Sequence, residues 1–218
     1  VKVYFREYSR LIGSILTPLL WLLVLGKGIG ASIDEDDGFA GVPYELFIFP
    51  GILTMTVLFQ SVFYGLYIVW DRKIDFLKEV LAAPLNRSTV FLGKCLGGVT
   101  DSMIQVTIII VLGLFIFPEI DYTLQSLMLV YLYLFLLAVI MTSLGLIIGS
   151  QMDSPEGFSL ITSLVVFPMY FLSGALFLKN NLIEEAPVIY WLTAINPASY
   201  AVDAIRYTMI PEDIFLVF

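Results

Sequence analysis

Polar side chains inside long apolar runs are the first residues of this sequence that could act on a substrate. Asp101 and Gln105 lie in one such run, and a carboxylate in a membrane-spanning segment is a functional candidate because burying its charge is costly. Thr54, Gln60 and Ser61 form a polar stripe in the run before it. Such side chains either join helices by hydrogen bonds or line a path. We treat all five as pathway-lining candidates, with helix packing as the alternative.

Enzymatic and metal chemistry find little support in the remaining residues. The sequence has no histidine, which removes the usual general base and the commonest metal ligand. Its single cysteine, Cys95, cannot form an internal disulfide. It contains no G-x-x-x-x-G-K-[ST] motif to hold ATP phosphates, and we read the acidic run at 34–37 as a solvated loop rather than a cation site. We therefore predict no catalytic residue, no metal site and no cofactor bound by this chain.

The elements that carry these residues are predicted from composition. Hydrophobic residues make up 59% and charged residues only 14% of the sequence, and its mean hydropathy is +0.94. The apolar residues fall in runs long enough to cross a bilayer as helices, without the alternation of barrel strands. This predicts an all-α integral membrane protein, a polytopic bundle in one transmembrane domain over 1–218. The predicted spans are about 11–30, 47–70, 95–117, 126–149 and 158–178, with the start of a truncated sixth at 214.

Basic residues orient these spans. Lys2, Arg6 and Arg10 precede the first span, and further lysines and arginines fill the segment 71–94, whereas the opposite connections are acidic. Basic loops face the cytoplasm, so we predict a cytoplasmic N-terminus and a cytoplasmic 71–94 segment, in the cell (plasma) membrane of a prokaryote. The spacing of the first three basic residues also predicts an N-terminal interfacial helix.

The segment 71–94 contains a predicted amphipathic helix over 72–82. At helical spacing its apolar and charged residues separate onto two faces, and Pro84 ends it because the residue before proline disfavours the α region. Two interpretations remain open on these grounds: an interfacial helix lying among lipid headgroups, or a docking surface for a soluble cytoplasmic partner. The apolar face holds Ile74, Phe76, Leu77, Val80 and Leu81; the charged face holds Arg72, Asp75, Lys78 and Glu79, with Lys73 out of place.

The outer end carries two short predicted helices. Asn196 is a good helix cap and Pro197 a good first helical residue. The helix over 198–210 is too short to span, and a second short apolar piece covers 188–195. We predict that the two dip into the membrane and return, as a re-entrant hairpin at 184–210. The spacing of Asp203 and Arg206 permits a pair on one face, which either neutralises both charges or acts in gating.

Three signatures give the chain a family resemblance. D-R-K-I-D-F-L-K-E-V-L-A-A-P-L-N-R-S followed by L-G-K, then F-L-S-G at Phe171 to Gly174, then N-P-A-S-Y-A-V-D-A-I-R at Asn196 to Arg206, stand in that order. The chain thereby resembles the membrane permease subunits of type-2 ABC exporters, the drug and polysaccharide exporter class. The form F-L-K-E-V-L-A-A-P is most similar to the daunorubicin-exporter-like branch. Asp75 departs from that branch, whose members often carry glycine there.

The resemblance implies an ATPase partner. In this family the short helix between the second and third spans is a coupling helix seated on a separate ABC ATPase subunit, which binds ATP and Mg. Two ATPase copies and a homodimer of this chain are implied. The implied ATPase-coupling residues are Arg72, Lys73, Asp75, Phe76, Leu77, Lys78, Glu79 and Leu81.

The resemblance also implies an extracellular gate and an activity. The hairpin would close the pathway toward the outside, with Asn196, Tyr200, Asp203 and Arg206 as gate candidates. The expected function is ATP-driven export of an apolar or amphiphilic substrate, a drug-like compound or a lipid. The alternatives are export of a lipid-linked glycan or polysaccharide by the same machinery, and an ATP-independent channel or transporter.

Overall fold

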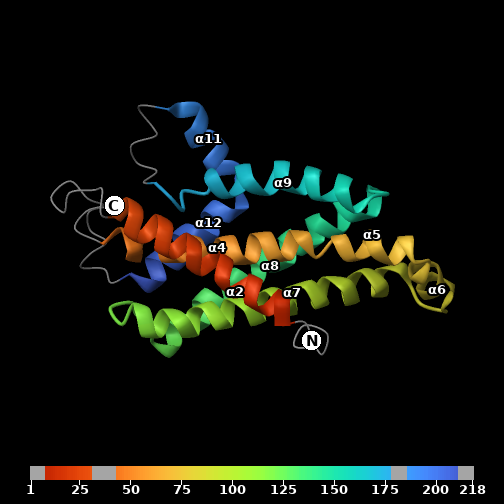
Figure 1. Cartoon of the computed structure of the whole chain (residues 1–218), viewed down its shortest axis with the longest axis horizontal. Coiled ribbons are helices and arrows are strands. Elements are labelled where there is room, and N and C mark those ends of the chain that lie inside the picture. Colours follow the sequence, from red (N-terminus) through yellow and green to blue (C-terminus); the bar gives the residue numbers. More distant parts are fainter. Residues whose placement is uncertain (1–7, 31–42, 178–185, 211–218) are drawn as a thin grey trace.

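The helices of this chain run mainly along one long axis (Figure 1). The computed structural model describes residues 8–30, 43–177 and 186–210, and all regular secondary structure in these ranges is helical. The all-α prediction is therefore confirmed. In chain order the elements are α2 (Tyr8–Trp21), the π-helix η1 (Leu22–Lys27), α3 (Gly28–Gly30), α4 (Tyr44–Phe63), α5 (Leu66–Lys73), α6 (Phe76–Ala82), α7 (Arg87–Ile116), α8 (Leu124–Gln151), α9 (Pro155–Phe171), α11 (Pro187–Ile195) and α12 (Pro197–Met209).

Three helical stretches are long and apolar enough to cross a membrane. They are Tyr44–Lys73, Arg87–Ile116 and Leu124–Gln151, and they contain the predicted second, third and fourth spans. The predicted first and fifth spans coincide with helices that are shorter or interrupted, so the full span count stays a prediction. The interfacial helix built on Lys2 and Arg6, the acidic run and the start of the sixth span lie outside the described residues.

The predicted limits of the spans differ from the helix ends. The segment assigned to 71–94 contains the last turn of α5 and the first turns of α7, which begins at Arg87. A membrane span ends where charged residues meet the headgroups, whereas the helix that contains it can continue for further turns past the apolar stretch. The connection between α5 and α7 is therefore shorter than predicted.

Helix α4 is the centre of the bundle. It packs against α7, α8, α9, α12 and η1, and residues such as Phe47, Leu53 and Leu58 are fully buried. A helix that is apolar all round belongs in such a place. The outer helices leave large apolar side chains uncovered, among them Phe115 and Leu124, as a surface in contact with lipid requires.

Glycines bring α8 against the junction of α4 and α5 at backbone distance. A methyl group added at Gly65 would overlap the carbonyl of Gly145, one at Gly145 would overlap the carbonyl of Val62, and one at Gly149 would overlap the carbonyl of Gly65. The spacing of Gly145 and Gly149 is the small-xxx-small pattern of helix contacts in membranes. The sequence contains this pattern, but two glycines on one helix do not indicate which neighbouring helix approaches them.

The two ends of the bundle are distinct (Figure 1). Helix α6 and the α8–α9 connection lie at one end, and α11, α12 and the α7–α8 turn lie at the other. The backbone amide of Asp121 in that turn donates to the carbonyl of Met209 at the end of α12, at 3.0 Å. The described helices therefore place the predicted inner and outer elements at opposite ends of the long axis.

Gly145→Ala tests the glycine contact. We expect the added methyl group to force α8 away from Val62 and to lower the free energy of unfolding by about 1–3 kcal/mol, the usual cost of overpacking. The measurement is thermal unfolding in detergent. Gly93→Ala on α7 is the matched control, because a methyl group there meets nothing within 4 Å; equal losses in both variants would contradict the contact.

Candidate functional site

A sharp turn separates α5 from α6. Helix α5 ends at Lys73, and Asp75 adopts a left-handed backbone with φ of 58°. The prediction of one helix over 72–82 is therefore wrong in its start, because a left-handed residue cannot lie inside an α-helix. Aspartate is among the few residues other than glycine that tolerate this conformation. Members of the daunorubicin-exporter-like branch often carry glycine at this position, and glycine is the residue that adopts a left-handed backbone most readily.

Helix α6 shows a mixed surface. Leu77 packs against the hydrophobic core, whereas Phe76 remains 47% exposed and Ile74, in the turn, 68% exposed. Lys78 and Glu79 are exposed, and Lys78 pairs with Asp75 at 2.6 Å. The side chain of Leu81 lies outside the described residues. The exposed aromatic ring beside two charges gives α6 a surface suited to a protein partner, since aromatic residues are enriched in interfaces.

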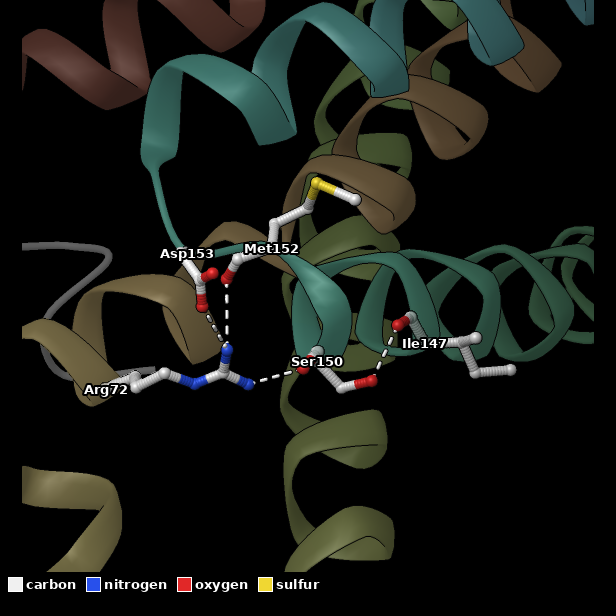
Figure 2. A network of polar contacts seen from close by, with 5 residues as sticks. All are labelled: Arg72, Ile147, Ser150, Met152 and Asp153. Carbon is white, nitrogen blue, oxygen red and sulfur yellow. Dashed lines mark hydrogen bonds and ion pairs between the residues drawn. The ribbon is translucent and has the colours of Figure 1, made fainter.

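Arg72 lies on the last turn of α5 and points at the α8–α9 connection (Figure 2). Its Nη1 donates to the carbonyl of Met152 and to Asp153 Oδ1, both at 3.2 Å, and its Nη2 donates to the carbonyl of Ser150. These carbonyls belong to the end of α8, where backbone acceptors lack helical partners and a positive charge is favourable. The guanidinium predicted to contact a partner is thus engaged within the chain.

Asp71 fastens the same turn to another helix. Its carboxylate pairs with Lys94 on α7, and both side chains are about four-fifths buried, at 18% and 20% exposure. Asp71 was not among the predicted site residues. The two partners are 23 positions apart, and nothing local in the sequence joins them. Lys73, in contrast, is exposed, with its Nζ 5.7 Å from the centre of the Trp70 ring.

The polar stripe on α4 is mostly buried. Thr54 is fully buried and donates to the carbonyl of Pro50 at 3.0 Å. Ser61 forms a hydrogen bond with Ser102 on α7 at 2.8 Å. The second contact joins two helices and supports the packing interpretation for Ser61, whereas the first lies within α4 and leaves the role of Thr54 a prediction.

The other pathway candidates differ in exposure. Gln60 is half-buried, whereas Asp101 and Gln105 are buried on α7. Their pathway role stays a prediction. Within the described ranges, no three acidic or cysteine side chains gather into a metal site.

Asn196 lies at the junction of α11 and α12. Its Oδ1 accepts a hydrogen bond from the amide of Ala198 at 3.0 Å, and its Nδ2 donates to the carbonyl of Met169 on α9. The hydroxyl of Tyr200 donates to the carbonyl of Ala194 at 2.6 Å, which joins α12 to α11. Helix α12 begins at Pro197, as the capping signal predicts.

Arg206 joins α12 to α4 and to the turn after α9. It is only 5% exposed, its Nη2 donates to the carbonyl of Gly174 at 3.1 Å and to that of Phe47 at 3.4 Å, and its guanidinium carbon lies 3.8 Å from the centre of the Phe47 ring. Asp203, its predicted partner, lies exposed on the same helix. The structure thus brings two of the signatures together through Arg206 and the F-L-S-G turn.

Comparison with known proteins gives these sites a context. The sequence model of the family described as ABC-2 type transporter matches residues 1–210. The chain is 30% identical to a putative transport permease ycf38 of Cyanophora paradoxa, over 95% of this chain and 71% of that protein. It is 28% identical to the inner membrane transport permease YadH of Escherichia coli K12, over 91% and 75%. It is 26% identical to nodulation protein J of Neorhizobium galegae, over 93% and 74%. No solved structure matches the chain.

Arg206→Met tests the contact of α12 with α4 and with the turn after α9. The substitution removes the donors that satisfy buried carbonyls, and we expect the free energy of unfolding to fall by about 1–3 kcal/mol. Thermal unfolding in detergent measures it. Arg87→Met, at an exposed arginine, is the matched control and should unfold like the wild type; an Arg206 variant of unchanged stability would contradict the buried contact.

Asp75 offers a test of the α5–α6 turn. Asp75→Gly relieves the left-handed strain and should stay within about 1 kcal/mol of the wild type, whereas Asp75→Val should be less stable by about 1–2 kcal/mol. Asp75→Ala removes the pair with Lys78, a small loss because both side chains are well exposed, and also places in the left-handed region a residue that tolerates it less well than aspartate. The order glycine, alanine, valine in thermal unfolding is expected; valine as stable as glycine would show that Asp75 is not left-handed.

Proposed function

The chain belongs to the ABC-2 type transporter family, and from this premise we propose that it is the membrane subunit of an ATP-driven exporter powered by a separate ATPase subunit. One observation carries the proposal: α6 is a short, exposed helix at one end of the bundle, joined to a membrane-capable helix on each side. The position of α6 between two membrane-capable helices matches that of the coupling helix that the resemblance implies. The ATPase would bind ATP and Mg, and this chain would supply the pathway.

The contact with the ATPase is assigned to the exposed part of α6. Phe76, Lys78 and Glu79 are open to a partner, whereas Leu77 faces the bundle. A partner that moves α6 would therefore act on the bundle through Leu77, through the end of α5 and through the connection 83–86 to α7. Arg72 is removed from the contact surface in this proposal because its guanidinium is held by the α8–α9 connection.

The substrate proposed is apolar or amphiphilic, a drug-like compound or a lipid. The support is the apolar surface of the bundle and a shallow hollow of about 270 Å³ on α2 and η1, lined by Thr17, Leu20, Trp21 and Val24. Three of these four side chains are apolar, so the hollow offers apolar rather than charged contacts. Membership of the daunorubicin-exporter-like branch stays a prediction.

The proposed assembly has two copies of this chain and two ATPase subunits. Its N-terminus and α6 would lie in the cytoplasm of a prokaryotic cell, and the α11–α12 hairpin would form the extracellular gate. The burial of Arg206 and the capping by Asn196 support a hairpin held firmly against the bundle.

Reversal of the α6 charges tests the proposal. Lys78→Glu with Glu79→Arg should abolish co-purification of the ABC ATPase subunit, because the reversal places like charges opposite each other across the interface and like charges repel. Thermal unfolding of the permease alone should not change, since both side chains are exposed. Glu119→Arg, exposed at the opposite end, is the control and should keep the ATPase.

Two further measurements complete this test. ATP hydrolysis by the reconstituted complex, measured with a panel of lipids, glycolipids and hydrophobic drugs, identifies the substrate class; stimulation by glycolipids alone would favour the glycan alternative. Transport by the purified permease with no ATPase present would contradict the proposal and favour the channel.

A further inference from the structure

The last turn of α5 holds two adjacent charged residues that reach different parts of the bundle. Asp71 pairs with Lys94 on α7, and Arg72 binds the α8–α9 connection. We call these two residues the α5 anchor. Helix α5 also packs directly against α6, α8 and α9. The anchor therefore lies just before α6 and contacts both α7 and the α8–α9 connection.

Most of the Arg72 contact is made with the backbone. Two of its three acceptors are the carbonyls of Ser150 and Met152 (Figure 2), and the third, Asp153, has a side chain that is 95% exposed. An exposed ion pair contributes little, whereas a cation that caps the end of a helix satisfies acceptors that have no other partner. Arg72 consequently fixes the end of α8 and, through the connection, the start of α9.

The Asp71 contact is made between two side chains. Both are largely buried, so the pair is less screened than one at the surface. Because the acceptor and the donor are both side chains, their charges can be exchanged by substitution. This makes the link to α7 testable on its own, apart from the link to α8 and α9.

The turn at Ile74 and Asp75 separates the anchor from α6. The left-handed Asp75 changes the chain direction directly after the anchor, and among the described side chains of α6 Leu77 alone packs against the core. The short α6 is thus joined to the bundle mainly through α5 on one side and through the connection 83–86 to α7 on the other. Resting on the proposed function, we propose that Asp71 and Arg72 are positioning residues that make α7 and α9 follow the ATP-driven movement of α6.

Spin labels on two helices test this proposal in the complete complex. Cys95→Ser removes the native thiol, and single cysteines replace Leu92 on α7 or Leu160 on α9, which are 58% and 63% exposed. The distance between equivalent labels in the two copies is measured in liposomes, without nucleotide and after trapping with Mg-ATP and vanadate. We expect trapping to shift the distance at both sites in the wild type.

The anchor variants should separate the two links. Arg72→Ala should lose the shift at Leu160 on α9 and keep it at Leu92. Asp71→Lys and Lys94→Asp should each lose the shift at Leu92, and the double exchange should restore it. Asp153→Asn should keep both shifts, because the backbone acceptors remain. Arg87→Ala, at an exposed arginine of α7, is the control and should behave as the wild type.

The outcomes distinguish this proposal from the proposed function. A wild-type complex that traps no nucleotide, or has no ATPase, overturns the proposed function and the anchor with it. Trapped nucleotide with no shift in the wild type, or with both shifts kept in every variant, overturns the anchor alone. Loss of both shifts together with loss of trapped nucleotide in each variant would show a purely structural role, and would also overturn it.

Discussion

The backbone contact between α8 and the α4–α5 junction is the constraint on which the rest of the structure depends. At Gly65, Gly145 and Gly149 the two helices lie so close that no side chain fits between them. In a membrane, where apolar burial between helices gives little driving force, such close approach is a main source of helix association. The contact also fixes the register of α5. Arg72 lies seven residues beyond Gly65, about 10 Å along a helix, and Ser150, one of its acceptors, directly follows Gly149.

Hydrogen bonds from two arginines to backbone carbonyls hold α9 at both of its ends. Arg72 binds the connection that leads into α9, and Arg206 binds the carbonyl of Gly174 in the turn that follows it. Each arginine comes from a different element, α5 at one end and α12 at the other. Between these points α9 presents exposed apolar residues such as Leu160 and Leu164. Its ends are therefore fixed by polar contacts with backbone, while its middle remains available to lipid or to another apolar surface.

The sequence predicted those features of the fold that depend on residues close together in the chain. The apolar runs predicted the membrane helices, and the pair Asn196 and Pro197 predicted the start of α12, because hydropathy and capping act within a few residues. The turn at Asp75 was missed because an aspartate in the left-handed region has no pattern of its own. The acceptors of Arg72 lie 78–81 positions away, and a single sequence does not record which distant carbonyls a side chain will meet. The contact of Arg72 with the α8–α9 connection therefore could not be predicted from the sequence.

The contacts of Arg72 and Arg206 differ in whether water can replace their hydrogen bonds when they break. The side chain of Arg72 is 36% exposed, so water can take over its hydrogen bonds as they open, and the net cost is that of an exchange between similar partners. Arg206 is 5% exposed, and a guanidinium that leaves its carbonyls there finds no water, which makes separation far more costly. A helix held in this way at both ends yields more easily at the α5 end than at the α12 end.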